Sequence, residues 1–227
     1  MKKKPLAFFD IDGTIFRSSL LIELQEYLVE YGVFPKIVTK ELESAHIAWL
    51  DRKGAYEAFI NEVVDTYQKR IIGVEESDVK RVANLVIKEE KERVYRYTRD
   101  LLRKIRKTHM LVAISGSPKD IVAAFNRYWK FDEIYATVYE VKNKKFTGNA
   151  LHKPANDKKK IVEHVLEKHG QSLKHSIGVG DTESDASFLS MVDEPIAFNP
   201  NKHLLKIAKR KNWHIVVERK DVIYRIS

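Results

Sequence analysis

The sequence predicts an α/β fold in which a parallel sheet is interrupted, after its first strand, by an all-helical insertion. Two apolar runs, Leu6 to Ile11 and Met110 to Ile114, have the length and composition of buried strands. The segment between them shows helical periodicity and no convincing strand. After the second run, helix and strand patterns alternate up to residue 217, as in a Rossmann-like sheet with helices on both faces.

Composition limits the class of protein. Of 227 residues, 44% are hydrophobic and 32% are charged, which is typical of a globular chain with a real core. No apolar run approaches the roughly 20 residues that a membrane span requires. The first nine residues imitate the start of a signal peptide, but Asp10 and Asp12 interrupt it, so we expect a soluble, cytoplasmic protein. Without cysteine, disulfides and thiolate metal sites are excluded.

The net charge of +9 would attract an anionic partner, such as a phosphorylated metabolite, a nucleic acid or an acidic membrane surface. The basic residues fall in short groups with acids between them: Lys2 to Lys4, Lys158 to Lys160 and Lys209 to Lys211. That pattern favours an ordinary solvated surface over a nucleic-acid interface. It predicts no particular oligomeric state.

The helical insertion, or cap, is predicted over residues 18–100, and the α/β core over residues 1–17 and 101–227. Gly13-Thr14 ends the first strand, and an apolar face then predicts a helix from about Ser18 to Gly32. Further helices are expected over residues 35–52, 56–72 and 77–107. Aromatic residues of the insertion are interpreted as helix packing: Trp49, Tyr56, Phe59 and Tyr67.

The rest of the core is predicted from turn and capping residues. Ser117, Pro118 and Asp120 would be the N-cap, first residue and third residue of a helix after the second strand. A hairpin is expected around Asn143, and Gly170 should end a helix. The remaining elements are helices at residues 157–169, 183–192 and 201–211 and strands at residues 175–179, 196–198 and 214–217.

Polar residues follow three of the predicted strands at the point where each strand ends. They are Asp10, Asp12, Ser115, Gly116, Gly180, Asp181 and, four residues further on, Asp185. In an open α/β sheet ligands bind outside the carboxyl ends of the strands, so these segments should meet at one site. Alone, each of them is a common turn sequence. Together and in this order, they predict a phosphate site.

Three aspartates suggest a magnesium-dependent reaction. Asp10, Asp12 and Asp181 offer the hard oxygen ligands that Mg²⁺ prefers, and Asp10 would attack phosphorus to give an acyl phosphate. Repulsion between a carboxylate and a phosphate costs about 4 kcal/mol per charge pair at ~4 Å and an effective dielectric of ~20. Mg²⁺ and Lys158 are the expected counter-charges, although Lys159 or Lys160 could replace Lys158.

The other residues have supporting roles in this hypothesis. Asp12 would protonate the leaving alcohol and then remove a proton from the water that hydrolyses the phospho-aspartate. Ser115 and the amides around Gly116 would bind phosphoryl oxygens, and Asp185 would support Lys158 or a metal-bound water. The expected substrate is a small phosphorylated metabolite. A phosphotransferase, a non-catalytic phospho-ligand-binding protein and a nucleic-acid-binding module remain alternatives.

The motifs DIDGT, LVAISG, Lys158 and GVGDTESD resemble those of the haloacid dehalogenase (HAD) superfamily. The resemblance covers essentially the whole chain and is greatest to its phosphoserine-phosphatase-like branch, which has a helical cap between the first two motifs and a hairpin before the lysine. It implies the roles given above and a mobile cap. Asp12 is typical of the phosphatase type within the superfamily.

Two positions depart from the phosphoserine phosphatase pattern. Those enzymes usually carry a glutamate nine residues after the nucleophile, where it holds the substrate's amino group, and this chain has Ser19 there. The resemblance therefore predicts intact chemistry with phosphoserine as a poor substrate. The second departure, Ser184 in place of an asparagine, changes little in this prediction.

Overall fold

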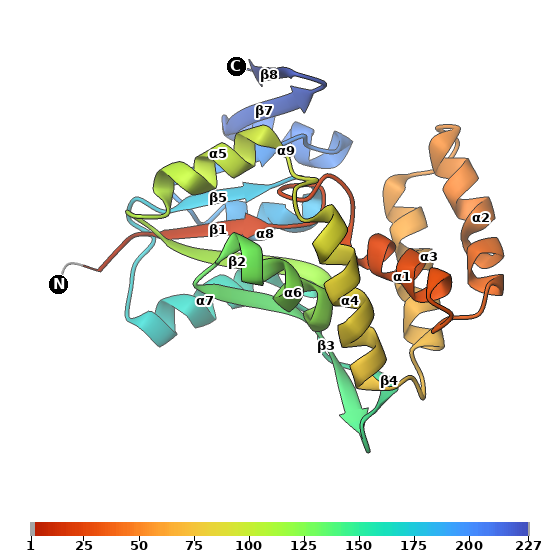
Figure 1. The fold of residues 1–227 in the computed structure, drawn as a ribbon. Coiled ribbons are helices and arrows are strands. Elements are labelled where there is room, and N and C mark those ends of the chain that lie inside the picture. The colour runs from red at the N-terminus through yellow and green to blue at the C-terminus, as the bar shows by residue number, and fades with distance from the viewer. Residues whose placement is uncertain (1–2, 227) are drawn as a thin grey trace.

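The computed structural model describes residues 3–226, which form one mixed sheet with helices packed on both faces (Figure 1). Its strand order is β4-β3-β2-β1-β5-β6-β7-β8. The strands are β1 Leu6–Asp10, β2 Met110–Pro118, β3 Glu133–Lys142, β4 Lys145–His152, β5 Ile177–Gly180, β6 Glu194–Phe198, β7 His214–Arg219 and β8 Val222–Ile226. Strand β1 pairs in parallel with β2 and β5, whereas β4 and β8 are antiparallel edge strands. The predicted α/β class with a Rossmann-like core is confirmed.

Side chains of β1 alternate between two apolar cores. Ala7 and Phe9 pack with residues of α5 and α6 on one face of the sheet, and Leu6 and Phe8 pack with α7, α8 and α9 on the other. The helices are α1 Leu20–Glu30, α2 Ile37–Leu50, α3 Tyr56–Arg70, α4 Glu76–Glu90, α5 Arg96–Ile105, α6 Lys119–Trp129, α7 Lys158–His169, α8 Ala186–Leu189 and α9 Lys202–Lys211. The four apolar residues of β1 are fully buried, so this strand is held from both sides.

Helices α1 to α4 lie between β1 and β2 in the chain, and the described residues from 18 to 100 contain no named strand. Two isolated backbone bridges lie where this segment meets the core: Val94 pairs with Phe16, and Glu75 pairs with Lys145 of the β3–β4 hairpin. The division into a core and a cap domain at residues 18 and 100 remains a prediction.

The predicted single helix over residues 77–107 is wrong. Helix α4 ends at Glu90, and α5 begins at Arg96. Between them the amide of Tyr95 donates to the carbonyl of Ile15, and the amide of Arg17 donates to the carbonyl of Arg93, at 2.9 Å each. These bonds replace the helical ones and return the chain to the sheet.

Three smaller corrections concern capping and short elements. Pro118, and not Ser117, is the N-cap of α6. The helix expected over residues 183–192 is a 3₁₀ turn, Glu183–Asp185, followed by the four residues of α8. Strand β8 was not predicted, because its exposed residues lack an alternating pattern. The hairpin around Asn143 is confirmed, with Asn143 and Lys144 both at positive φ.

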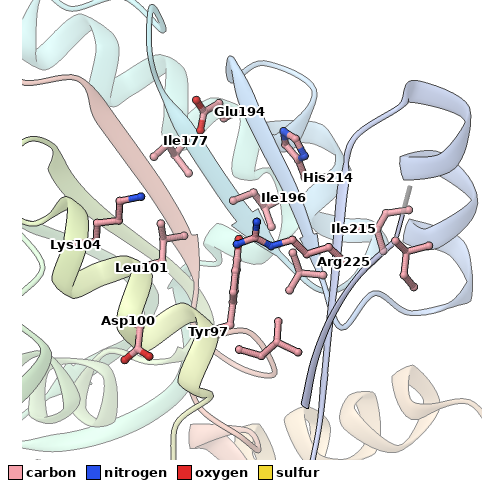
Figure 2. A pocket seen from close by; sticks show the side chains of 13 residues that line it. Tyr97, Asp100, Leu101, Lys104, Ile177, Glu194, Ile196, His214, Ile215 and Arg225 are labelled. Atoms are coloured by element: carbon pink, nitrogen blue, oxygen red, sulfur yellow. The ribbon is translucent and has the colours of Figure 1, made fainter. Parts of the chain in front are cut away.

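No helix among residues 3–226 is long and apolar enough to span a bilayer. The structure also contains a groove of about 430 Å³ between α5 and strands β6 to β8 (Figure 2). Ile177, Glu194 and His214 line it, and each is the first residue of a strand. The groove therefore lies at the amino ends of β5, β6 and β7, opposite to the end at which the polar motifs were predicted to meet.

Candidate active site

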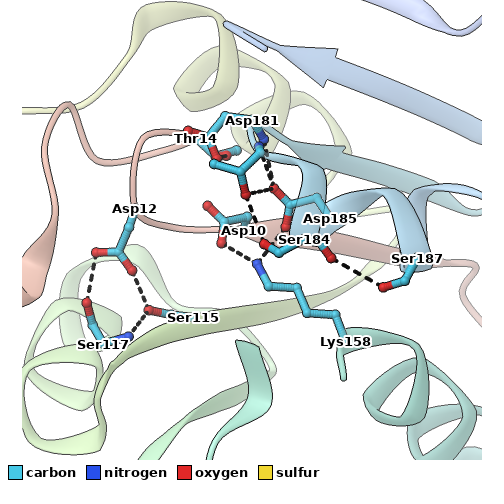
Figure 3. Close-up of polar contacts among 11 residues, drawn as sticks. Asp10, Asp12, Thr14, Ser115, Ser117, Lys158, Asp181, Ser184, Asp185 and Ser187 are labelled. Carbon is cyan, nitrogen blue, oxygen red and sulfur yellow. Dashed lines mark hydrogen bonds and ion pairs between the residues drawn. The ribbon is translucent and has the colours of Figure 1, made fainter. Parts of the chain in front are cut away.

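The predicted site residues converge at the carboxyl ends of β1, β2 and β5 (Figure 3). A cleft of about 460 Å³ opens there, and its lining includes Asp10, Asp12, Gly116, Lys158 and Asp181. Two further predicted residues, Ser115 and Asp185, lie beneath this lining and are fully buried. The structure therefore brings the residues named from the sequence to one cleft, and their roles stay predictions.

Lys158 is the lysine that enters the cleft. It is the first residue of α7, only 2% exposed, and its Nζ atom lies 2.6 Å from Asp10 Oδ1 and 2.6 Å from Asp185 Oδ1. Burial opposes the charge, but these two carboxylates raise the lysine pKa. Lys159 and Lys160, the alternatives left open by the sequence, have exposed side chains that pair with Glu163 and Asp157.

Asp185 fixes the loop that follows β5. One of its carboxylate oxygens accepts hydrogen bonds from the amides of Asp181 and Thr182, at 2.9 Å each, while the other pairs with Lys158. A Cβ atom on Gly180 would lie 2.5 Å from the Asp185 carboxyl carbon, so glycine is required there. Asp185 thus connects the lysine to the backbone that carries Asp181.

Asp10, Asp181 and Asp185 form the cluster that could hold a metal ion, because each offers a carboxylate oxygen within 4.8 Å of the others. Asp10 Oδ2 is buried without a hydrogen-bond partner in residues 3–226. Burial, opposed by Lys158 and reinforced by Asp185 and Asp12, raises the pKa of Asp10 to about 7. Burial and the charge of Asp10 likewise raise the pKa of Asp181 well above its ordinary value. A hard divalent cation fits this donor set, since it would relieve the repulsion and use the free oxygen.

Asp12 faces away from that cluster. Its Oδ1 accepts hydrogen bonds from the Leu20 amide at 2.6 Å and the Ser117 hydroxyl at 2.9 Å, and its Oδ2 accepts one from the Ser115 hydroxyl at 2.6 Å. The carboxylate is therefore held in one orientation at the cleft wall. The structure does not bring the Asp12 side chain into the group of mutually close carboxylates, where Asp185 stands instead.

Sequence reasoning missed several residues of the site. Ser117 was interpreted as a helix cap but binds Asp12, and Thr14 Oγ1 lies 3.3 Å from Asp181 Oδ1. Tyr56 was interpreted as packing, yet it also lines the cleft, together with Glu57. The repeated serine in Ser115-Gly-Ser117 and the threonine of the first motif were available as indications, whereas nothing local marks Tyr56 or Glu57.

The doubly wound sheet, the helices inserted after its first strand and the buried carboxylates around one lysine define a Rossmann-like α/β protein with a candidate catalytic cleft. More specifically, the chain belongs to the haloacid dehalogenase-like hydrolase family, whose sequence profile matches residues 7–190. The family resemblance and the hydrolase class expected from the motifs are thereby confirmed.

Curated relatives of this chain include two phosphatases. A phosphoserine phosphatase of Mycobacterium tuberculosis is 23% identical over 220 residues, which cover 92% of this chain and 69% of the relative. A histidinol-phosphatase of Neisseria meningitidis serogroup C is 23% identical over 226 residues, covering 94% of this chain and 98% of the relative. The two activities named are those of these relatives.

Solved structures confirm the fold. A protein of unknown function from Bordetella pertussis superposes with a TM-score of 0.77 at 17% identity, over 94% of this chain and 98% of that one. A phosphoserine phosphatase described as a phospho-aspartyl intermediate analogue superposes with a TM-score of 0.63 at 21% identity, over 97% and 96%. The phosphoserine-phosphatase-like architecture expected from the sequence is therefore present.

Proposed function

We propose that this protein hydrolyses small-molecule phosphate monoesters through a phospho-aspartyl intermediate on Asp10, with Mg²⁺ as cofactor. The observation that carries the proposal is the state of Asp10, which is 5% exposed, ion-paired through Oδ1 and unpartnered at Oδ2 within the described residues. A buried carboxylate oxygen without a donor is costly unless a ligand uses it. Its place at a cleft beside Lys158 suits a nucleophile.

Asp10 and Asp181 would hold the magnesium ion, with Asp185 beside them, and the ion would supply positive charge to the substrate's phosphoryl oxygens. The participation of Asp12 in metal binding stays a prediction, because its carboxylate is engaged by two serine hydroxyls and an amide. Lys158 would remain a fixed cation that offsets the negative charge of Asp10 as the substrate approaches.

In the first step an Asp10 oxygen forms a bond to phosphorus while the bond from phosphorus to the leaving oxygen breaks. Asp12 gives that oxygen its proton, so the product is a neutral alcohol. In the second step a water oxygen attacks the phosphorus of phospho-Asp10, Asp12 takes the water's proton, and the Asp10 carboxylate is restored with release of orthophosphate. The Gly116 amide would position the transferring group from the last part of β2, whereas the role of Ser115 in binding it stays a prediction, because the buried Ser115 hydroxyl donates to Asp12.

The test is hydrolysis of an aryl phosphate with Mg²⁺ present and after exhaustive chelation. We expect activity with Mg²⁺ and its loss to background in the chelated protein, because Asp10 and Asp181 would again repel the substrate. Activity that survives chelation would contradict the proposal. Product analysis in the presence of glycerol separates hydrolysis from phosphoryl transfer, the main alternative, and substrate binding without turnover would indicate a non-catalytic protein. A cytoplasmic location remains a prediction.

Substrate choice forms a second part of the proposal. Ser19 lines the cleft and is 3% exposed, so it could not neutralise a buried ammonium group. Glu57 also lines the cleft, but its Oε1 accepts a hydrogen bond from Asn201 Nδ2 at 2.8 Å. A guanidinium group close to the phosphate site would also repel an ammonium group, but the Arg17 side chain is exposed and lies over the Tyr95 ring.

We expect phosphoserine to have a kcat/KM about 10-fold or more below that of glycerol, sugar or nucleoside monophosphates, which corresponds to ~1.4 kcal/mol of transition-state binding. The measurement is kcat/KM across this panel for the unmodified protein and for Ser19→Glu. The substitution should raise kcat/KM for phosphoserine relative to the other substrates. Glu57→Gln is the matched control. If phosphoserine leads the panel and Glu57→Gln removes that lead, the amino group is held by Glu57 and the specificity argument fails, while the mechanism stands.

A further inference from the structure

Tyr56 brings a polar group from α3 to the cleft of the sheet. It is the first residue of that helix and shares the cleft lining with Asp10, Asp12 and Asp181. Its ring is half-buried and packs against Trp49, with 5.4 Å between ring centroids. Because the ring is fixed in this way, the hydroxyl has a defined place beside the carboxylates.

The electrostatic surroundings keep the Tyr56 hydroxyl protonated. Burial raises its pKa, and the negative charges of Asp12, Asp181 and Asp10 raise it further, in that order. Tyr56 lines the same cleft as these aspartates, so its hydroxyl can offer its proton to a ligand bound there. A neutral donor is useful at this place, since it binds a phosphoryl oxygen without offsetting the charges that hold the metal.

A single asparagine ties the start of α3 to the core. Asn201 Nδ2 donates to Glu57 Oε1 at 2.8 Å, next to Tyr56 in the chain. The Asn201 backbone amide donates to the carbonyl of Asp181 at 2.8 Å, and its Oδ1 accepts from the Leu204 amide at 2.8 Å as the N-cap of α9. Thus the residue that fixes Asp181 also fixes the first turn of α3.

We propose that the Tyr56 hydroxyl donates a hydrogen bond to an oxygen of the bound phosphoryl group, and that Asn201, through Glu57, positions Tyr56 for that contact. This inference rests on the proposed phosphatase function and deepens it by adding a substrate-binding residue from the predicted cap. The contact from Tyr56 to the phosphoryl group would then form only when α3 is correctly positioned against the sheet. The contact requires no change in the chemistry assigned to Asp10 and Asp12.

The first experiment compares Tyr56→Phe with the unmodified, Mg²⁺-loaded protein, using inorganic orthophosphate as the binding probe and an aryl phosphate as substrate. We expect a roughly 10-fold weaker Kd for orthophosphate and a similar fall in kcat/KM, the effect of one hydrogen bond to a charged group. Tyr97→Phe, in the groove of Figure 2, is the matched control and should change neither value.

Two results would overturn the role of the hydroxyl. If Tyr56→Phe keeps both values within twofold, the hydroxyl does not touch the substrate. If hydrolysis falls while orthophosphate affinity is unchanged, it acts on the leaving group and the assignment is wrong. An unmodified protein that binds orthophosphate but does not hydrolyse the ester would instead contradict the proposed function.

The second experiment tests the positioning role with Asn201→Asp. Aspartate still caps α9 but cannot donate to Glu57, so the helix is kept and the link is lost. We expect kcat/KM to fall about as far as in Tyr56→Phe. The double variant that combines Asn201→Asp with Tyr56→Phe should lose little more activity than either single variant. Adding Glu57→Gln to Asn201→Asp reverses donor and acceptor and should restore most of the activity. Additive losses or absent rescue would overturn the role of Asn201.

Discussion

Asp10 and Asp12 stand two residues apart in the chain, but their carboxylates point to different groups of partners (Figure 3). Asp10 shares a buried ion pair with Lys158 and keeps one oxygen without a partner in the described chain. Asp12 is half-buried, and both of its oxygens accept hydrogen bonds from neutral groups. A free oxygen beside a fixed cation suits attack on phosphorus, whereas a carboxylate held by hydroxyls suits proton transfer.

The backbone creates this difference. Strand β1 ends at Asp10, so that side chain belongs to the last position of the sheet. Gly13 then turns the chain with φ at +79°, and a Cβ atom there would lie 2.2 Å from Asp181 Oδ2. Just before this turn, and beyond the end of β1, Asp12 meets Ser117 and the start of α1, while Asp10 stays beside Lys158. Two identical residues therefore lie in different surroundings, because one is the last residue of the strand and the other stands where the chain leaves it.

The largest effect is expected for Asp10→Asn, which removes the nucleophile with hardly any change in volume. We predict that aryl phosphate turnover falls by at least about 10⁴-fold, because the remaining groups position the substrate without reacting with it. Steady-state kinetics, with circular dichroism to verify the fold, measures this. A variant with near-normal kcat would show that the nucleophile is misassigned.

A smaller loss is expected for Asp12→Asn. The asparagine oxygen can still accept from Ser117 and Leu20, so the side chain stays in place, but it cannot carry a proton. We predict a fall in kcat of roughly 10²- to 10⁴-fold, the usual contribution of general acid–base catalysis.

Acid-quench experiments with a radiolabelled substrate should reveal which step is impaired in Asp12→Asn. Because the water that hydrolyses phospho-Asp10 would lack its base, more label should remain on the protein per turnover than in the unmodified chain. If kcat of Asp12→Asn stayed within threefold of normal, Asp12 would not be the acid–base residue, and the functional contrast with Asp10 would be lost.

The sequence predicted those parts of the site that depend on short patterns. An apolar run followed by Asp10-Ile-Asp12-Gly marks a strand end, and the parallel order of the sheet then places the other strand ends nearby. The orientation of Asp12 could not be predicted in the same way, because its partner Ser117 lies 105 residues away and also fits a helix cap.

The features that were missed share a dependence on distant contacts. The break between α4 and α5 comes from hydrogen bonds to residues 15–17, although the local pattern favours one continuous helix. The pair of Glu57 and Asn201 spans 144 residues, and neither residue belongs to a motif. Local propensity located the elements, and tertiary hydrogen bonds decided where two of them end and which side chains reach the cleft.

The smallest effect expected from this comparison concerns stability and pH in the chelated protein. The pKa of Asp10 is raised from 3.8 to about 7 by burial, with repulsion from Asp185 and Asp12 adding to the shift and Lys158 opposing it, so the folded state binds this proton more tightly than the unfolded chain does. Between pH of about 4 and about 7 the unfolded carboxyl is ionised first, and the free energy of unfolding therefore decreases as pH rises. Above about 7 the contribution of Asp10 becomes constant.

Asp10→Asn lacks this titration, and it also removes one of the charges that raise the pKa of Asp181. We therefore expect urea unfolding in EDTA to show the unmodified protein losing stability relative to Asp10→Asn between pH 4.5 and 7, with the difference levelling off above that range. Mg²⁺ should reverse the trend in the unmodified protein, since an ion bound to the folded state favours the ionised carboxylates. Parallel pH profiles of the two proteins in EDTA would mean that Asp10 is ionised in the folded state without metal. The contrast with Asp12 would then rest on the ion pair with Lys158 alone.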